Sequence, residues 1–228
     1  MRSLQQIMLV LFILPSSLNL IPPQWLKLVS PAQPSIAAAQ QLRDSLVNGE
    51  RDSAVLKPLV NECCTANVPF QSELLGDGDL WRAVSIVSGE TPRWQRNAEL
   101  LPFLRNRAGQ AYSFDDSGLG TVVNYGEVLG RTLYFKAEGT FRRAAASSGS
   151  RCPQDFDVDI RQGGFVLGGK EFVSSAIAGP GFLRCLYLDE DIRIFESPKD
   201  SPDRWEEAGL VVVQVRDALF EDPVLGKL

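Results

Sequence analysis

Residues 133–142 read LYFKAEGTFR, and this stretch alternates between apolar and polar side chains with a period of two. Phe135 and Phe141 share one parity, while Lys136 and Glu138 share the other. Successive side chains of a β-strand point to opposite faces of the sheet, so the pattern predicts a strand with one buried face. The aromatic residues on that face predict a core built from strands.

The same kind of pattern recurs through the rest of the chain. Strand-like runs cover residues 80–87, 120–129, 155–161, 164–167, 171–177, 182–188, 192–195 and 210–215. Residues typical of turns separate them, and among these the triplet Gly179-Pro180-Gly181 predicts a turn of its own. Many short strands with frequent turns predict a mainly β fold, a closed or nearly closed antiparallel β-barrel. A barrel of this size is either filled by side chains or holds one small apolar ligand.

Helices are expected before the strands. Residues 40–64 read QQLRDSLVNGERDSAVLKPLVNECC and carry apolar residues at spacings of three and four. The pair Asn48-Gly49 predicts a break between two helices, and Pro58 is expected to bend or shorten the second one.

Composition narrows the classes of function. The 228 residues contain no histidine, which excludes Ser-His-Asp and Cys-His nucleophile systems and removes the commonest metal ligand. Of the 23 bases only Arg2, Lys27 and Arg43 precede the first acid, Asp44, so 20 bases stand against 28 acids in the rest of the chain. Such an acidic body is a poor partner for nucleic acid, whose phosphates need clustered Lys and Arg. We therefore expect no nucleic-acid partner.

The candidate metal ligands have unsuitable spacings. Cys63, Cys64, Cys152 and Cys185 form no CxxC motif, so we interpret them as buried thiols, with a disulfide as the alternative if the chain is secreted. The three aspartates of the DxDxD run at 155–159 lack the glycine and glutamate of a calcium loop, which predicts a solvated strand face. We expect no metal and no cofactor.

Catalysis finds little support in the sequence. Asp189, Asp191, Glu127 and Glu138 are candidates for an acid–base pair if a barrel mouth brings two of them together. The glycine-rich pieces lack the context of a nucleotide-binding loop. We expect a protein that is not an enzyme and assign no catalytic residue.

The run Tyr187–Phe195, YLDEDIRIF, places three acids inside an apolar stretch. We expect the acids to form a tight turn between two strands, with Asp189 capping the turn and Arg193 pairing with an acid.

Residues 1–39 differ from the remainder. The apolar run MLVLFIL at 8–14 follows Arg2, is too short to span a bilayer and precedes several prolines, as in a signal peptide. The absence of acids and the abundance of Ser, Pro and Ala are typical of an organelle import sequence, so we expect a bipartite plastid leader, with an ordinary buried helix as the alternative. The predicted organisation is a leader at 1–39 and one domain at 40–228.

Four pieces of sequence, taken together, resemble the plastid lipid-associated proteins, also called the PAP/fibrillin family. They are QQLRDSLVNGE at 40–50, LLGDGDLWRAVSIVSG at 74–89, GTVVNYGEV at 120–128 and, most specifically, YLDEDIRIF. The residues that carry the resemblance are Trp81, Arg82, Asn124, Asp189, Arg193 and Ile194.

The resemblance implies a lipocalin-like barrel in the chloroplast, at plastoglobules or thylakoids, that binds or organises apolar lipids such as prenylquinones and carotenoids. The aromatic residues, which serve either as core or as ligand wall, supply the candidate lipid contacts Trp81, Tyr125, Phe135, Phe141 and Phe156. The alternative is a scaffold for a plastid isoprenoid- or quinone-synthesising enzyme, which would use outer faces and loops such as residues 204–207.

Overall fold

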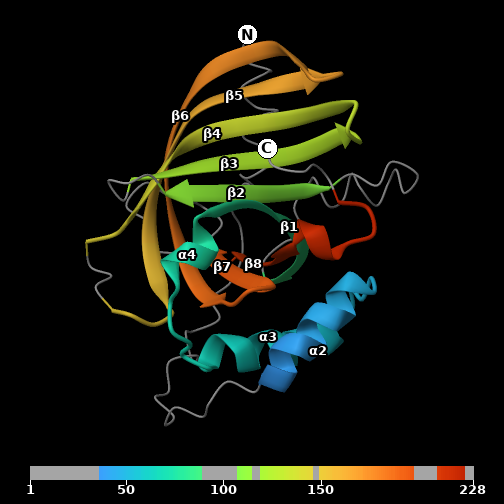
Figure 1. The fold of residues 1–228 in the computed structure, drawn as a ribbon, viewed down its shortest axis with the longest axis vertical. Coiled ribbons are helices and arrows are strands. Elements are labelled where there is room, and N and C mark those ends of the chain that lie inside the picture. Colours follow the sequence, from blue (N-terminus) through green and yellow to red (C-terminus); the bar gives the residue numbers. More distant parts are fainter. Residues whose placement is uncertain (1–35, 89–106, 115–118, 146–148, 198–209, 224–228) are drawn as a thin grey trace.

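The computed structural model describes residues 36–88, 107–114, 119–145, 149–197 and 210–223 (Figure 1). In this part of the chain eight antiparallel strands form a closed barrel, in which each strand pairs with the next and the last pairs with the first. The strands are β1 (Asp77–Ser88), β2 (Ala108–Phe114), β3 (Gly120–Leu129), β4 (Leu133–Arg143), β5 (Gln154–Leu167), β6 (Lys170–Leu188), β7 (Ile192–Ser197) and β8 (Leu210–Arg216). The helices are α2 (Ile36–Val47), α3 (Ser53–Thr65), α4 (Ser72–Leu75) and the 3₁₀ turn η1 (Asp217–Leu219). The predicted mainly β barrel with N-terminal helices is confirmed.

The predicted alternation decides which side chains fill the barrel. On β4, Phe135, Ala137 and Phe141 are buried, and the neighbouring Val158 of β5 lies in register with Phe141. The opposite parity of β4 carries the ion pair between Lys136 and Glu138 on the outer surface. One parity of β4 therefore forms the core, as the period-two pattern requires.

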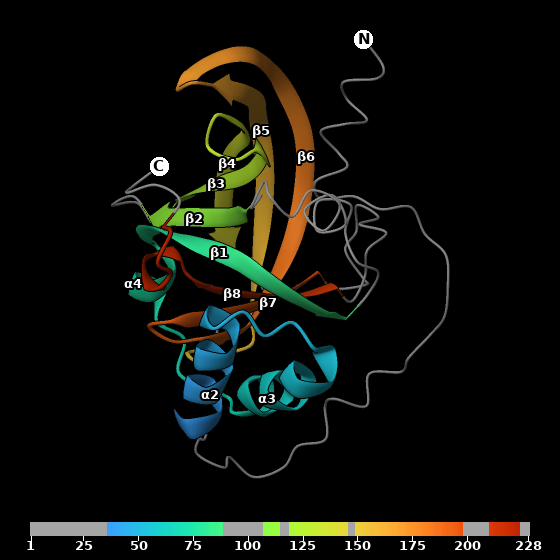
Figure 2. The ribbon, with the colours of Figure 1, turned by 90° about the vertical axis from the view of Figure 1, so that its right-hand side faces the viewer.

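Helices α2 and α3 cover the outer side of β7 and β8 (Figure 2). The outward residues Ile192, Ile194, Val213 and Val215 are fully buried and join one core cluster with helix residues such as Leu42 and Leu56. These two strands bury both faces, which explains why they read as nearly continuous apolar runs. The predicted break at Asn48-Gly49 is confirmed, and the Asp52 side chain caps α3 by accepting a hydrogen bond from Ala54 N at 2.8 Å. Helix α3 continues past Pro58 to Thr65 without being shortened.

The prediction of a turn at Gly179-Pro180-Gly181 is wrong. Strand β6 continues through the triplet without a break, and the three residues pair with Ile160, Asp159 and Val158 of β5. The pairing of β6 with β7 begins only at Arg184, so Pro180, which has no N–H group, lies where β6 has a single ladder partner. The runs predicted separately on either side of the triplet are therefore one strand, and residues 155–161 and 164–167 likewise merge into β5.

Strand β2 was not predicted. Its sequence, AGQAYSF, has no clear apolar alternation, because small residues occupy several of its positions. Gly109 is needed there, since a Cβ atom at this position would lie 2.5 Å from the carbonyl oxygen of Trp81 on the paired strand β1. Strand β2 therefore forms because its small residues let it lie close to β1, and not because it carries an alternating apolar face.

The barrel has two ends. The α4 end holds helix α4 and the β6–β7 turn, and the tip end holds the β3–β4 and β5–β6 hairpin connections. Strands β5 and β6 are the longest and arch beyond the rest of the barrel (Figure 2). The predicted leader lies outside the described residues apart from residues 36–39, which form the first turn of α2. Within the described residues, no helix has the length and apolar character that a membrane crossing requires.

Candidate functional site

A pocket of about 410 Å³ opens at the α4 end. Its wall is made by three phenylalanines, two polar residues of α4, a glycine and an arginine: Phe70, Phe114, Phe156, Ser72, Glu73, Gly76 and Arg143. This volume lies within the range of small-molecule pockets, which are mostly apolar with a few polar groups. The chemistry of the wall suits an apolar ligand with a polar end.

Aromatic rings form the inner side of the pocket. The ring centroids of Phe114 and Phe141 lie 4.8 Å apart, and those of Phe141 and Phe156 lie 5.8 Å apart. Phe141 also contacts Tyr112 edge to face, at 4.8 Å. Gly120 makes room for this cluster, because a Cβ atom there would lie 2.0 Å from Cε1 of Phe141. The rings form a continuous apolar layer from the pocket into the barrel.

Arg143 places a positive charge on the pocket wall. Its Nε donates a hydrogen bond to Oε1 of Gln154 at 2.6 Å, and its guanidinium lies 5.5 Å from the ring centroid of Phe70. These contacts hold the long side chain against the aromatic wall. The pocket therefore has one cationic edge.

A second arginine lies inside the barrel. Arg193 of β7 is 0% exposed; its Nε donates to Oε1 of Gln214, and its Nη2 donates to the carbonyl oxygen of Gln110 at 2.9 Å. The amides continue the network, from Gln214 Nε2 to Gln110 Oε1 at 2.9 Å and from Gln110 Nε2 to Asn124 Oδ1 at 2.8 Å. All of these partners are neutral.

Three aromatic rings surround the Arg193 guanidinium. Its Cζ lies 4.7 Å from the ring centroid of Tyr112, 4.9 Å from that of Trp81 and 5.3 Å from that of Phe195. Burial lowers the pKa of Arg193 to about 9, and burial raises the pKa of Tyr112 to about 12. The guanidinium still carries its positive charge near neutral pH.

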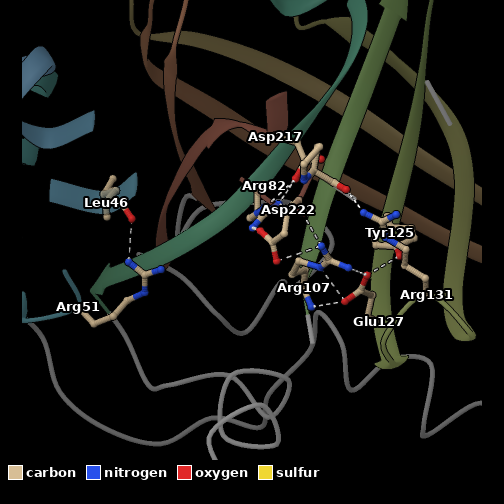
Figure 3. A network of polar contacts seen from close by, with 10 residues as sticks. Leu46, Arg51, Arg82, Arg107, Tyr125, Glu127, Arg131, Asp217 and Asp222 are labelled. Atoms are coloured by element: carbon tan, nitrogen blue, oxygen red, sulfur yellow. Dashed lines mark hydrogen bonds and ion pairs between the residues drawn. The ribbon is translucent and has the colours of Figure 1, made fainter. Parts of the chain in front are cut away.

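The outer face of β1, β2 and β3 carries a different polar network (Figure 3). Glu127 accepts two hydrogen bonds from the Arg107 guanidinium, at 2.9 and 2.6 Å, and one from the Tyr125 hydroxyl at 2.9 Å. Burial alone would lower the pKa of Arg107, but the hydrogen bond and charge of Glu127 raise it above the ordinary value. This bidentate pair is a well-formed buried ion pair.

The C-terminal segment at 217–223 is bound to the same outer face. Arg82 donates from Nε to Oδ1 of Asp217 at 2.7 Å and forms an ion pair with Asp222 at 3.0 Å, while Arg107 Nη1 donates to the Asp222 carbonyl oxygen at 2.6 Å. Arg131 donates to the carbonyl oxygen of Pro223. Three arginines thus hold this segment across the strands (Figure 3).

The β6–β7 connection confirms the expected turn. Oδ1 of Asp189 accepts hydrogen bonds from the backbone N–H groups of Asp191 and Ile192 at 2.8 and 2.7 Å, and Oδ2 accepts one from Tyr187. The Asp191 carboxylate pairs with Arg43 of α2 at 2.7 Å. The prediction that Arg193 pairs with an acid is wrong, because Arg193 points into the barrel, away from the turn.

The four candidate carboxylates for an acid–base pair do not gather in one place. Asp189 and Asp191 belong to the β6–β7 turn, whereas Glu127 is bound to Arg107 and Glu138 to Lys136 on the outer face. The aspartates of the DxDxD run pair with outer arginines, as Asp155 does with Arg184 at 2.7 Å, which confirms a strand face outside the core. Among the described residues no group of acids and cysteines is arranged to hold a metal ion.

All four cysteines are free thiols, and Cys63, Cys152 and Cys185 are buried, in agreement with the favoured interpretation. Burial raises the pKa of Cys63 to about 12, so this thiol stays protonated and unreactive near neutral pH.

The predicted lipid contacts lie in three separate places. Trp81, Phe141 and Phe156 belong to the main core, and Phe156 lines the pocket. Phe135 packs in a second cluster with Ala137, nearer the tip end. Tyr125 lies on the opposite face of β3 from Asn124, packed with Leu80 and Tyr134 on the outside of the barrel.

Sequence reasoning missed Phe70, Phe114 and Arg143 of the pocket. Phe114 ends the strand that was not predicted, and Phe70 lies in the link between α3 and α4. The only sequence signal for Phe114 was that it lies two residues after Tyr112, so that on a strand both side chains point to the same face.

The tip end exposes apolar side chains. Phe172 and Leu167 are 55% and 51% exposed, and Leu129 and Val128 are also exposed. The two hairpins lie side by side, since Leu133 and Leu167 are register partners. We call Val128, Leu129, Leu167 and Phe172 the apolar rim.

Closed antiparallel topology, an apolar pocket and an N-terminal helix pair define the class of this protein as a lipocalin-like β-barrel. No protein-family model matches the sequence, and no curated protein is significantly similar to it.

Proposed function

We propose that this chain is a non-enzymatic plastid protein that holds an apolar lipid in its barrel and associates with plastoglobules or thylakoids. The observation that carries the proposal is the pocket lined by Phe70, Phe114 and Phe156. Burial of apolar ligand surface against such rings contributes about 25 cal/mol per Å² to binding before the costs of association. The import-like leader and the four motif pieces support the plastid location.

The apolar rim supports association with a lipid surface. Large exposed apolar side chains on adjacent hairpins are typical of a protein or membrane interaction site. Lys170, the first residue of β6, lies between the rim residues Leu167 and Phe172, where a basic side chain can reach lipid head groups. The rest of the body is acidic, so apolar contact rather than overall charge must carry the association.

Lipid capture tests the pocket. The purified full-length chain is incubated with total plastid lipid extract and separated from free lipid, and the retained lipid is identified by mass spectrometry. We expect one class of apolar lipid at close to one molecule per chain. Ser72→Trp, which adds an indole to the pocket wall at the start of α4, should reduce retention at least about fivefold, because it fills the space that the lipid needs.

Ser53→Trp is the matched control, since it changes the exposed first residue of α3, outside the pocket. It should retain as much lipid as the unchanged chain. An unchanged chain that emerges empty contradicts the proposal, and equal retention by both variants contradicts the placement of the lipid in this pocket.

A further inference from the structure

The interior of the barrel contains two buried hydrogen-bond donors that have no acceptor. Among the described residues, Nη1 of Arg193 and Nε1 of Trp81 are the only buried side-chain nitrogen or oxygen atoms without a partner. They belong to neighbouring groups, since the guanidinium of Arg193 lies 4.9 Å from the Trp81 ring centroid. Buried polar groups in proteins are nearly always satisfied, so two adjacent exceptions point to an acceptor that the described residues do not supply.

Among the described residues, the charge of Arg193 also has no counter-ion. Within the part of the chain that the structure describes, no carboxylate lies within ion-pair distance of this guanidinium. Asp77 and Arg216 are the carboxylate and the guanidinium whose charges act on it, and Asp77 is held by Arg216 at 2.6 Å. Neutral amides occupy the polar positions around it: Gln110 comes from β2, Asn124 from β3 and Gln214 from β8.

A buried cation without an anion is costly, and a carboxylate is the group that best offsets the cost. The planar guanidinium presents its N–H groups in a fork that matches the two carboxylate oxygens. A neutral alcohol or ester supplies an acceptor but no charge. One unpaired cation matches one negative charge, so a monocarboxylate fits better than a diacid.

The surroundings select a carboxylate with a long apolar chain. Tyr112 contacts both Arg193 and Phe141, and Phe141 contacts the pocket residues Phe114 and Phe156. Tyr112 and Phe141 are both buried, so a hydrocarbon chain that joins the pocket to Arg193 must displace these two rings. A small hydrophilic anion would gain nothing from this path.

We propose that Arg193 receives the carboxylate of an amphipathic lipid inside the barrel, so that the barrel prefers a long-chain fatty acid to a neutral lipid of the same length. This inference rests on the proposed function, in that the barrel must hold a lipid at all. The head-group position is Arg193, with Trp81 Nε1 as the neighbouring donor, and the aromatic layer holds the chain.

Competition between an acid and its neutral analogue tests the inference. Dodecanoate and dodecan-1-ol each displace the neutral dye Nile red from the full-length chain at pH 8, where the acid is ionised. We expect dodecanoate to bind at least about tenfold more tightly, a ratio that corresponds to about 1.4 kcal/mol. Arg193→Met should abolish this preference and leave the affinity for dodecan-1-ol within about twofold.

Arg161→Met is the matched control, because it removes an arginine from the outer face of β5, where the side chain is 67% exposed and pairs with Asp159. It should keep the full preference for the acid. Thermal unfolding of each variant verifies that the barrel is intact. If Arg193→Met does not fold, Arg193→Lys, which retains the charge, replaces it in the competition experiment. The lysine variant should keep part of the preference.

A spectroscopic readout separates ligand contact from a purely structural role of Arg193. With [1-¹³C]dodecanoate, the carboxyl resonance of the bound acid should titrate at lower pH in the unchanged chain than in Arg193→Met, because an adjacent cation favours the ionised form. A structural arginine would leave this titration unchanged.

The outcomes are distinct. Equal binding of acid and alcohol by the unchanged chain, or a preference that survives in Arg193→Met, overturns the inference and leaves the proposed function standing. Failure of Nile red and of both ligands to bind the unchanged chain overturns the proposed function itself, and the inference with it.

Discussion

Arg107 and Arg193 are both largely removed from water, but they lie on opposite faces of the barrel wall and have different partners. Arg107 meets the fully buried carboxylate of Glu127 in a bidentate pair, and its pKa is raised. Arg193 meets only amides and rings, and burial lowers its pKa. An arginine that already has its anion stabilises the fold, whereas one without an anion is available for a ligand.

The largest effect is expected from breaking the paired arginine. Glu127→Gln removes the buried anion and leaves Arg107 with only the partly exposed carboxylate of Asp222 at 3.4 Å, so we expect the free energy of unfolding to fall by about 3 kcal/mol. Urea denaturation measures this loss. Glu138→Gln is the control, since the exposed pair with Lys136 contributes at most about 1 kcal/mol.

If Glu127→Gln and Glu138→Gln cost the same, the outer network does not stabilise the barrel in this way. Replacing both Arg107 and Glu127 with apolar residues should restore most of the lost stability, because no unpaired charge is then buried. The double variant separates a missing anion from a general defect in packing.

A smaller effect is expected from removing the unpaired arginine. Arg193→Met loses the ring contacts and two hydrogen bonds but also removes an uncompensated buried charge, so the free energy of unfolding should change by less than about 1 kcal/mol at pH 7. Urea denaturation of the ligand-free protein checks this. A loss close to that of Glu127→Gln would show that both arginines have the same structural role.

The same variant gives a pH dependence with a defined sign. The pKa of Arg193 is about 9 in the folded chain, below its ordinary value in the unfolded chain, so above pH 9 the unfolded chain binds more protons than the folded chain. The free energy of unfolding of the unchanged chain should therefore rise relative to that of Arg193→Met as pH increases above 9. Parallel urea titrations of the two proteins at pH 8 and pH 10 measure the difference, and no relative gain at pH 10 would contradict it.

The smallest change in stability is expected when the interior arginine is given an anion. Gln214→Glu keeps the shape of the side chain that already accepts from Arg193 Nε and adds a negative charge. We expect the free energy of unfolding to stay within about 0.5 kcal/mol of the unchanged value, because a second buried charge offsets most of the Coulomb gain. The preference for dodecanoate over dodecan-1-ol should disappear, and a preference that persists would place the carboxylate elsewhere.

Much of the barrel was readable from local sequence. The alternation at 133–142 identified β4 and its buried face, and the acids of YLDEDIRIF identified the β6–β7 turn, because both signals depend on neighbouring residues alone. Strand β2 and the passage of β6 through Pro180 were not readable, because each depends on which strand lies alongside.

The candidate site divides in the same way. Trp81, Phe141 and Phe156 were predicted as candidates because they are aromatic, and all three are buried. Phe114 entered the pocket only because β2 takes its place in the barrel. Tyr125 is aromatic like the other candidates, but its parity on β3 places its side chain on the outside of the barrel.

The sequence by itself determined the strand period, the helix pair, the capped turn and the acidic body without histidine, since these follow from the order and type of neighbouring residues. Only the tertiary structure decided which arginine has an anion. Glu127 reaches Arg107 because β2 and β3 pair, whereas barrel closure surrounds Arg193 with Gln110, 83 residues away, and Gln214, 21 residues away. The balance between charge and burial is set by contacts across the barrel, and no local pattern contains them.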